Sequence, residues 1–167
     1  MTKFLSFAIL FCLLFPSVFG QIQNLILTAN QNNKWLDSLK TLTLDKQLLT
    51  IKNRLLSDTD VFVRQSYPDR IKVVDSLDHR VYGDGKPTLI IGGYPMIIDN
   101  KTQPNKIISL TRLLTDTYIK EISILSPNDP ATSALYGSPG QFGIIIMTLT
   151  RKKYTKLFKR LELKPNY

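Results

Sequence analysis

Two stretches of the chain repeat apolar residues at the three- and four-residue spacing of a helix. In 45–56, Leu48, Ile51 and Leu55 share one face, and the cations Lys46, Lys52 and Arg54 fall on the solvated side. The stretch 106–115 repeats the pattern. We therefore expect two helices that each cover a core with one face. Shorter helical patterns lie around Trp35 and at 131–136. We expect one or two helical turns around Trp35, with its side chain as a half-buried anchor in the core.

Apolar runs rich in β-branched residues predict short strands. The clearest is 143–150, which begins with glycine, and 119–125 shows partial alternation. The run 88–91 is almost continuously apolar, which indicates a strand covered on both faces. The expected strands are 61–63, 71–75, 88–91, 119–125 and 143–150, with further candidates at 25–27 and, as a hairpin partner, 96–98.

This order of elements predicts the α+β class, with a small mixed sheet of about five short strands and two or three short helices. The chain is 43% apolar and 21% charged, which is typical of a globular protein and not of a disordered one. Its 167 residues allow one domain with a substantial core.

Residues 1–20 have the pattern of a secretory signal peptide. Lys3 precedes an apolar run over 4–15, and small residues stand at Val18 and Gly20. The run is short for a membrane span, which needs about 20 residues. We expect cleavage near Gly20 and an exported protein that is periplasmic or associated with the outer membrane.

The chain is basic, with 22 Lys and Arg against 13 Asp and Glu and a formal charge of +9. Cys12 is the single cysteine and lies within the expected leader, so the mature protein is expected to form neither a disulfide nor a thiolate metal site. Because the aromatic residues do not alternate with the cations in a stacking pattern, we expect no nucleic-acid partner. An exported basic protein instead meets anionic lipid or polysaccharide.

Residues 87–153 contain two motifs in a fixed order. In the first, an apolar strand runs into Gly92, Gly93 and Pro95. In the second, the strand 119–125 precedes a small-residue helix, a Leu-Tyr-Gly turn and a glycine-led strand that ends in cations. Both resemble the plug domain of TonB-dependent outer-membrane receptors. The motif residues are Gly92, Gly93, Pro95, Ala134, Leu135, Tyr136, Gly137 and Gly143.

We interpret these motif residues as determinants of the fold and not as ligand contacts. Small side chains such as Ala134 would let their helix sit close to the sheet, Gly137 would permit a left-handed helix end, and Gly143 would allow close backbone approach. The resemblance implies an exported binding domain of the bacterial cell envelope, with an outer-membrane barrel or another envelope protein as partner. We expect exposed sheet edges around 89–91 or 144–147 to make that contact.

Three departures from the family indicate that the chain cannot transport alone. A complete receptor continues into a transmembrane barrel, whereas only a short basic segment follows Thr150 here. Gly92 stands where the family carries an aspartate, and 21–45 contains no convincing energy-coupling box. The expected organisation is a signal peptide at 1–20, a lead segment at 21–44, a plug-like domain at 45–150 and a basic tail at 151–167.

The tail combines apolar residues at helical spacing, such as Leu157 and Phe158, with many cations. It could lie on an anionic membrane surface, or it could pack its apolar stripe on its own domain; we favour the packed arrangement because it is the commoner use of such a helix. The candidate surface-binding residues are Arg151, Lys152, Lys153, Lys156, Lys159 and Arg160.

No catalytic constellation emerges from the sequence, so we expect a protein that is not an enzyme and has no metal or cofactor. Asp75, Asp78 and His79 suggest a hydrolase, but triad residues converge from separate elements and rarely from one loop. A small secreted hydrolase that uses this loop is the alternative function, and a degenerate receptor remnant is another.

Overall fold

The computed structural model describes residues 25–63, 81–83, 86–96, 98, 102–127, 129–136 and 140–163. The expected leader, the strand at 71–75, the Asp75/Asp78/His79 loop and Gly137 lie outside the described residues.

The first described helix, α2 (Ala29–Lys40), is much longer than the one or two turns expected around Trp35. It begins with a capping box in which Thr28 Oγ1 accepts a hydrogen bond from the Gln31 amide, and the Gln31 side chain accepts one from the Thr28 amide. The strand expected at 25–27 is absent, because these residues have no regular structure and lead into this cap.

The two helices with the strongest apolar spacing form as expected. Helix α3 (Leu44–Ser57) matches the prediction for 45–56, and α4 (Pro104–Leu113) begins two residues before the predicted stretch, with its proline in the first turn. A short 3₁₀ turn, η1 (Asp58–Asp60), follows α3. Helix α5 (Pro130–Tyr136), the 3₁₀ turn η3 (Lys152–Tyr154) and helix α6 (Thr155–Lys159) complete the set of described helices.

The α+β class is confirmed, but the described strands form two sheets. Strands β3 (Thr88–Ile91), β4 (Tyr94–Met96), β5 (Ile119–Leu125) and β6 (Ile144–Leu149) make a mixed sheet in the order β4-β3-β6-β5. Strands β3 and β6 are parallel, whereas the outer pairs are antiparallel. Strands β1 (Val61–Val63) and β2 (Val81–Gly83) form a separate parallel pair. The strand count and the single sheet were therefore predicted wrongly, and the described helices exceed the two or three expected.

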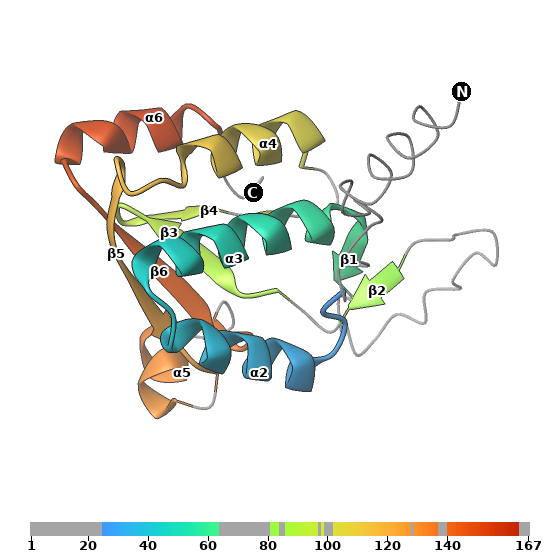
Figure 1. The fold of residues 1–167 in the computed structure, drawn as a ribbon. Coiled ribbons are helices and arrows are strands. Elements are labelled where there is room, and N and C mark those ends of the chain that lie inside the picture. The colour runs from blue at the N-terminus through green and yellow to red at the C-terminus, as the bar shows by residue number, and fades with distance from the viewer. Residues whose placement is uncertain are drawn as a thin grey trace, which may run out of the picture.

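The core lies against one face of the four-stranded sheet. Figure 1 shows α3 crossing in front of this sheet, with α4 and α6 above it and α2 below. Leu89, Ile91, Ile145 and Met147 are all buried and share a core cluster with residues of these helices. In register, Leu89 lies opposite Ile145 and Ile91 opposite Met147, so alternate residues of both central strands face the core.

The core draws on the lead segment and the tail as well as on 45–150. Leu36 and Leu39 of α2 are completely buried in the cluster, and Phe158 of α6 and Leu163 are 1% and 4% exposed in it. The tail helix therefore packs its apolar side on the domain, which confirms the arrangement favoured from the sequence.

Candidate functional site

The Gly92-Gly93 turn joins β3 to β4 as a two-residue hairpin loop. Both glycines have positive φ, +56° and +82°, and Ile91 pairs with Tyr94 across the turn. A hairpin loop of this length favours positive φ at both positions, which glycine adopts without strain. A Cβ at Gly92 would also lie 2.5 Å from Leu149 Cδ1. Gly92 therefore serves the turn and its packing, and Pro95 is exposed on β4.

The second motif folds as strand, helix and antiparallel strand within one sheet. Ile122 of β5 lies opposite Met147 of β6, and α5 connects the two strands. Ala134 is exposed and so does not make the close contact expected of it, whereas Thr132 of the same helix is completely buried. Leu135 is 72% exposed and Tyr136 is partly buried. Leu135 therefore does not contribute to the core, and its side chain is available at the surface.

Gly143 permits close contact between the first described helix and the last strand. Its φ is +86°, and a Cβ there would lie 2.5 Å from Leu36 Cδ1 and 3.0 Å from the Leu125 carbonyl oxygen. Beside it, the Asn32 side-chain amide donates a hydrogen bond of 2.8 Å to the Phe142 carbonyl. The expectation of close backbone approach at Gly143 is confirmed, and the neighbour is α2.

The sheet edges differ from those expected as contact sites. Residues 89–91 lie in β3 and 144–147 in β6, and these are the two central strands, each paired on both sides. The prediction that they form exposed edges is wrong. The outer strands of this sheet are β4 and β5, and β5 presents Lys120, Glu121 and Ser123 as exposed side chains.

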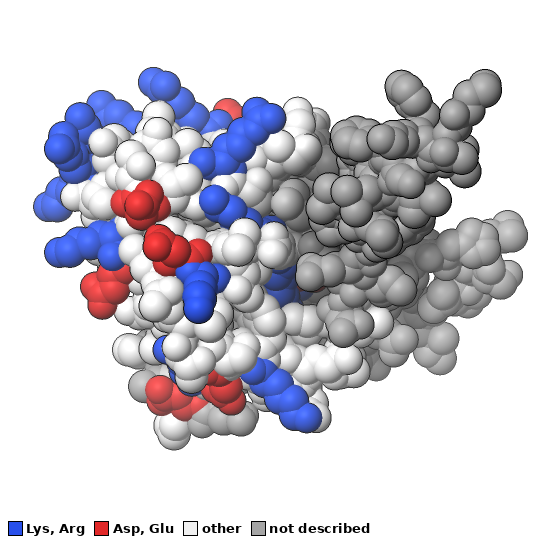
Figure 2. Space-filling model, viewed as in Figure 1, with Lys and Arg blue, Asp and Glu red and all other residues white. Residues whose placement is uncertain are grey.

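Six cations form the most distinctive surface of the described residues. We call this set the basic surface; its side chains are all exposed, and its members are Arg151, Lys152, Lys153, Lys156, Lys159 and Arg160. Figure 2 shows Lys and Arg gathered on the upper left of the molecule, where Figure 1 places α6. The sequence 151–163 contains a single carboxylate, Glu162, whose side chain is 79% exposed and lies 3.7 Å from Lys106 Nζ.

Tyrosine rings support two cations of the basic surface. Lys159 Nζ lies 3.9 Å from the centroid of the Tyr94 ring, and Lys153 Nζ lies 5.5 Å from that of Tyr154. The Tyr154 ring in turn meets Tyr118 edge to face at 4.9 Å. Such cation–π contacts attract the ammonium group to the ring face. These contacts do not neutralise the charge of the two lysines.

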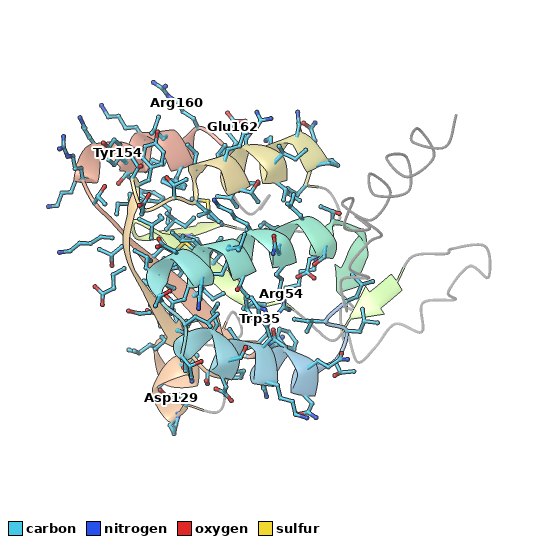
Figure 3. The ribbon with its side chains drawn as sticks, viewed as in Figure 1. Trp35, Arg54, Asp129, Tyr154, Arg160 and Glu162 are labelled. Carbon is cyan, nitrogen blue, oxygen red and sulfur yellow. The ribbon has the colours of Figure 1, made fainter. Side chains whose placement is uncertain are left out.

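A second cationic feature is buried between α2 and α3. Arg54 Nε donates to Asp58 Oδ2 at 3.0 Å, and the guanidinium carbon lies 4.4 Å from the Trp35 ring centroid (Figure 3). The side chains of Arg54 and Asp58 are 5% and 6% exposed, so the expectation that Arg54 is solvated is wrong. Trp35 is partly buried against the core, as expected. Burial lowers the pKa of Arg54 and the Asp58 carboxylate opposes that shift.

Within the part of the chain that the structure describes, the buried pair of Arg54 and Asp58 leaves some of its hydrogen-bonding atoms without a partner. Among the described residues, Arg54 Nη1 and Nη2 and Asp58 Oδ1 have no hydrogen-bond partner. Lys86 Nζ donates to the Asp58 backbone oxygen at 2.6 Å. The four-residue spacing of Arg54 and Asp58 is visible in the sequence, but it indicates a helix-surface pair equally well.

Neither a metal-binding cluster nor a membrane-spanning helix is found among the described residues. Within the ranges given above, no three His, Cys, Asp or Glu side chains gather where they could hold a metal ion. None of the described helices has the length and apolar character needed to cross a bilayer.

Comparisons of the chain with known protein families, with curated proteins and with solved structures find no match.

Proposed function

We propose that the chain is an exported, non-enzymatic binding domain of the bacterial cell envelope, related to the plug of TonB-dependent receptors and unable to transport alone. The observation that carries the proposal is the arrangement of both motifs in one sheet. Strand β3 of the Gly-Gly hairpin pairs with β6. Strand β6 also pairs with β5, and the compact helix α5 connects these two strands along the chain. The resemblance rests on the same two motifs, taken in their order along the chain.

The exposed part of the second motif supports binding as the activity. Leu135 is 72% exposed, although it belongs to the Leu-Tyr-Gly segment on which the resemblance rests. Thr132, which is completely buried, makes the inward contact of the same helix. A single exposed leucine is common on protein surfaces, so the support comes from its position beside the outer strand β5, whose edge can recruit a partner strand. We infer that α5 and the outer strand β5 face an outer-membrane barrel or another envelope protein.

Site-specific photo-cross-linking tests this proposal. A photoreactive amino acid at Leu135 or Ser123 is introduced into the full chain in cells with their native envelope, and Lys34 of α2 serves as the control position. All three side chains are exposed. We expect discrete adducts with an outer-membrane protein at the first two positions and none at Lys34.

Cell fractionation decides the remaining parts of the proposal. We expect the processed protein, lacking residues 1–20, in the periplasmic or outer-membrane fraction. Unprocessed protein in the cytoplasm, or equal cross-linking at all three positions, would contradict the proposal. Failure to detect the protein in any fraction would instead favour a degenerate receptor remnant.

A further inference from the structure

We propose that the basic surface docks the domain on an anionic phospholipid bilayer by charge alone, without insertion of an apolar helix face. The inference goes beyond the proposed function, which concerns a protein partner of α5 and β5. It rests on that function only in assuming that the protein reaches a membrane surface.

The charge of this surface is concentrated along the chain, since 151–163 contains six cations and one carboxylate. All six cations lie within 151–160, and each is exposed. The sole carboxylate of 151–163, Glu162, lies next to Lys106 of α4 and so takes part in a pair with a seventh cation. Near an anionic leaflet each cation contributes roughly fivefold in affinity, so several acting together give measurable adsorption.

The apolar side of the tail helix is already occupied. Phe158 and Leu163 are buried in the core, and Leu157 and Leu161 are partly buried. An amphipathic helix that enters a bilayer needs a free apolar face. Since α6 uses this face within the domain, only the cations remain for the membrane, and binding should respond strongly to salt.

The residue types favour lipid over protein or nucleic acid. Four of the six cations are lysines, which protein–protein interface cores disfavour, whereas mobile lipid phosphates can gather under flexible ammonium groups. Base stacking would need aromatic faces that are open to a ligand. Here the rings of Tyr94 and Tyr154 are partly buried and lie under Lys159 and Lys153.

Vesicle co-sedimentation of the purified processed chain tests the inference. One vesicle set contains phosphatidylcholine and phosphatidylglycerol, and the other contains phosphatidylcholine alone. We expect binding to the anionic vesicles, little binding to the neutral ones, and a loss of at least about tenfold in affinity between low and high salt.

Two charge-reversal variants with the same change in net charge locate the contact. Lys152→Glu/Lys156→Glu alters the basic surface, whereas Lys34→Glu/Lys46→Glu alters exposed positions on α2 and α3. We expect the first variant to lose at least about tenfold in affinity and the second to lose much less. Circular dichroism and thermal unfolding of both variants establish that each remains folded.

Four outcomes would overturn the inference: equal binding to neutral vesicles, insensitivity to salt, equal losses in the two variants, or full displacement by inorganic phosphate at the same phosphate concentration. The last would identify a site for the free anion. Vesicle binding without cross-links at Leu135 would leave this inference standing and contradict the proposed protein partner. Cross-links without vesicle binding would contradict this inference and leave the proposed protein partner standing.

Discussion

Arg54 and Lys159 both place a cation over an aromatic ring, but they lie in opposite environments. Arg54 is 4.4 Å from the Trp35 ring, buried between two helices and paired with Asp58. Lys159 is 3.9 Å from the Tyr94 ring, exposed, and belongs to the basic surface. The same kind of contact is therefore part of the buried packing at Arg54, whereas at Lys159 it leaves a charged group exposed to a ligand. Burial, and not the ring, makes the difference.

The pKa of Arg54 shows the consequence of burial. Burial lowers this pKa, so the folded protein holds the Arg54 proton less tightly than the unfolded chain does. Burial of the charge therefore opposes folding at every pH below the folded pKa. The Asp58 carboxylate reduces this penalty, so the stability of the region depends on the pair remaining intact.

The largest expected effect comes from removing one member of the buried pair. Asp58→Ala leaves the Arg54 guanidinium buried without its carboxylate, and we expect a loss of about 3–5 kcal/mol in the free energy of unfolding. Urea denaturation measures this loss. A change below about 1 kcal/mol would mean that the charge of Arg54 is solvated and that the contrast with Lys159 does not hold.

Replacing both members sharpens the comparison. Arg54→Met/Asp58→Leu removes both charges and fills similar space, so we expect a smaller loss than for Asp58→Ala, within about 2 kcal/mol of the original protein. The same denaturation experiment compares the two variants. If the double variant loses as much stability as Asp58→Ala, packing around Trp35 and not the unpaired charge dominates the region.

Loss of the exposed ring contact should have a much smaller effect. Lys159→Met keeps most of the side-chain stem over Tyr94 and removes the charge, so we expect a stability change of at most about 1 kcal/mol. Thermal unfolding measures it, with Trp35→Leu as the matched change in the buried contact. A larger loss of stability for Lys159→Met than for Trp35→Leu would mean that the exposed contact, and not the buried one, stabilises the fold more.

The smallest expected effect concerns the exposed pair of Asp37 and Lys40. A hydrogen bond of 3.1 Å from Lys40 Nζ is the main cause that lowers the pKa of Asp37. Desolvation opposes this shift, and the charge of Lys40 and a hydrogen bond from Ser126 Oγ add to it. A carboxylate with a lowered folded pKa stabilises the protein above its unfolded pKa, and this contribution is lost as pH falls through the folded pKa. Unfolding temperatures of the original protein and Asp37→Asn should converge in acid. A constant difference at all pH values would exclude a role for this titration.

Local patterns predicted the parts of the fold that depend on neighbours in sequence. Helix α3 follows from the spacing of Leu48, Ile51 and Leu55, and the β5-α5-β6 order follows from apolar runs separated by turn residues. The length of α2 was missed although Thr28 and Gln31 have the spacing of a capping box. The helix start is therefore visible in the sequence, although its length is not.

Features that depend on distant partners were not predictable in the same way. The central position of β3 depends on its pairing with β6, whose paired residues lie 56 positions later, and periodicity carries no information on pairing. The burial of Arg54 depends on Trp35 of another helix, and the inward position of Thr132 on the approach of Gly140. For the candidate site, the cations of the basic surface were predicted by residue, whereas their tyrosine supports require the fold.

The contact at Gly143 bears on the order in which the protein can fold. Leu36 reaches the start of β6 because Gly143 has no side chain, and the same core is completed only by Phe158 and Leu163. A nascent or translocating chain in which only α2 to β5 have emerged lacks β6, the strand between β3 and β5. The backbone hydrogen bonds that β3 and β5 make with β6 could not yet form. The topology is thus one of high contact order, in which acquisition of tertiary structure must wait until the C-terminal strand and helix have emerged.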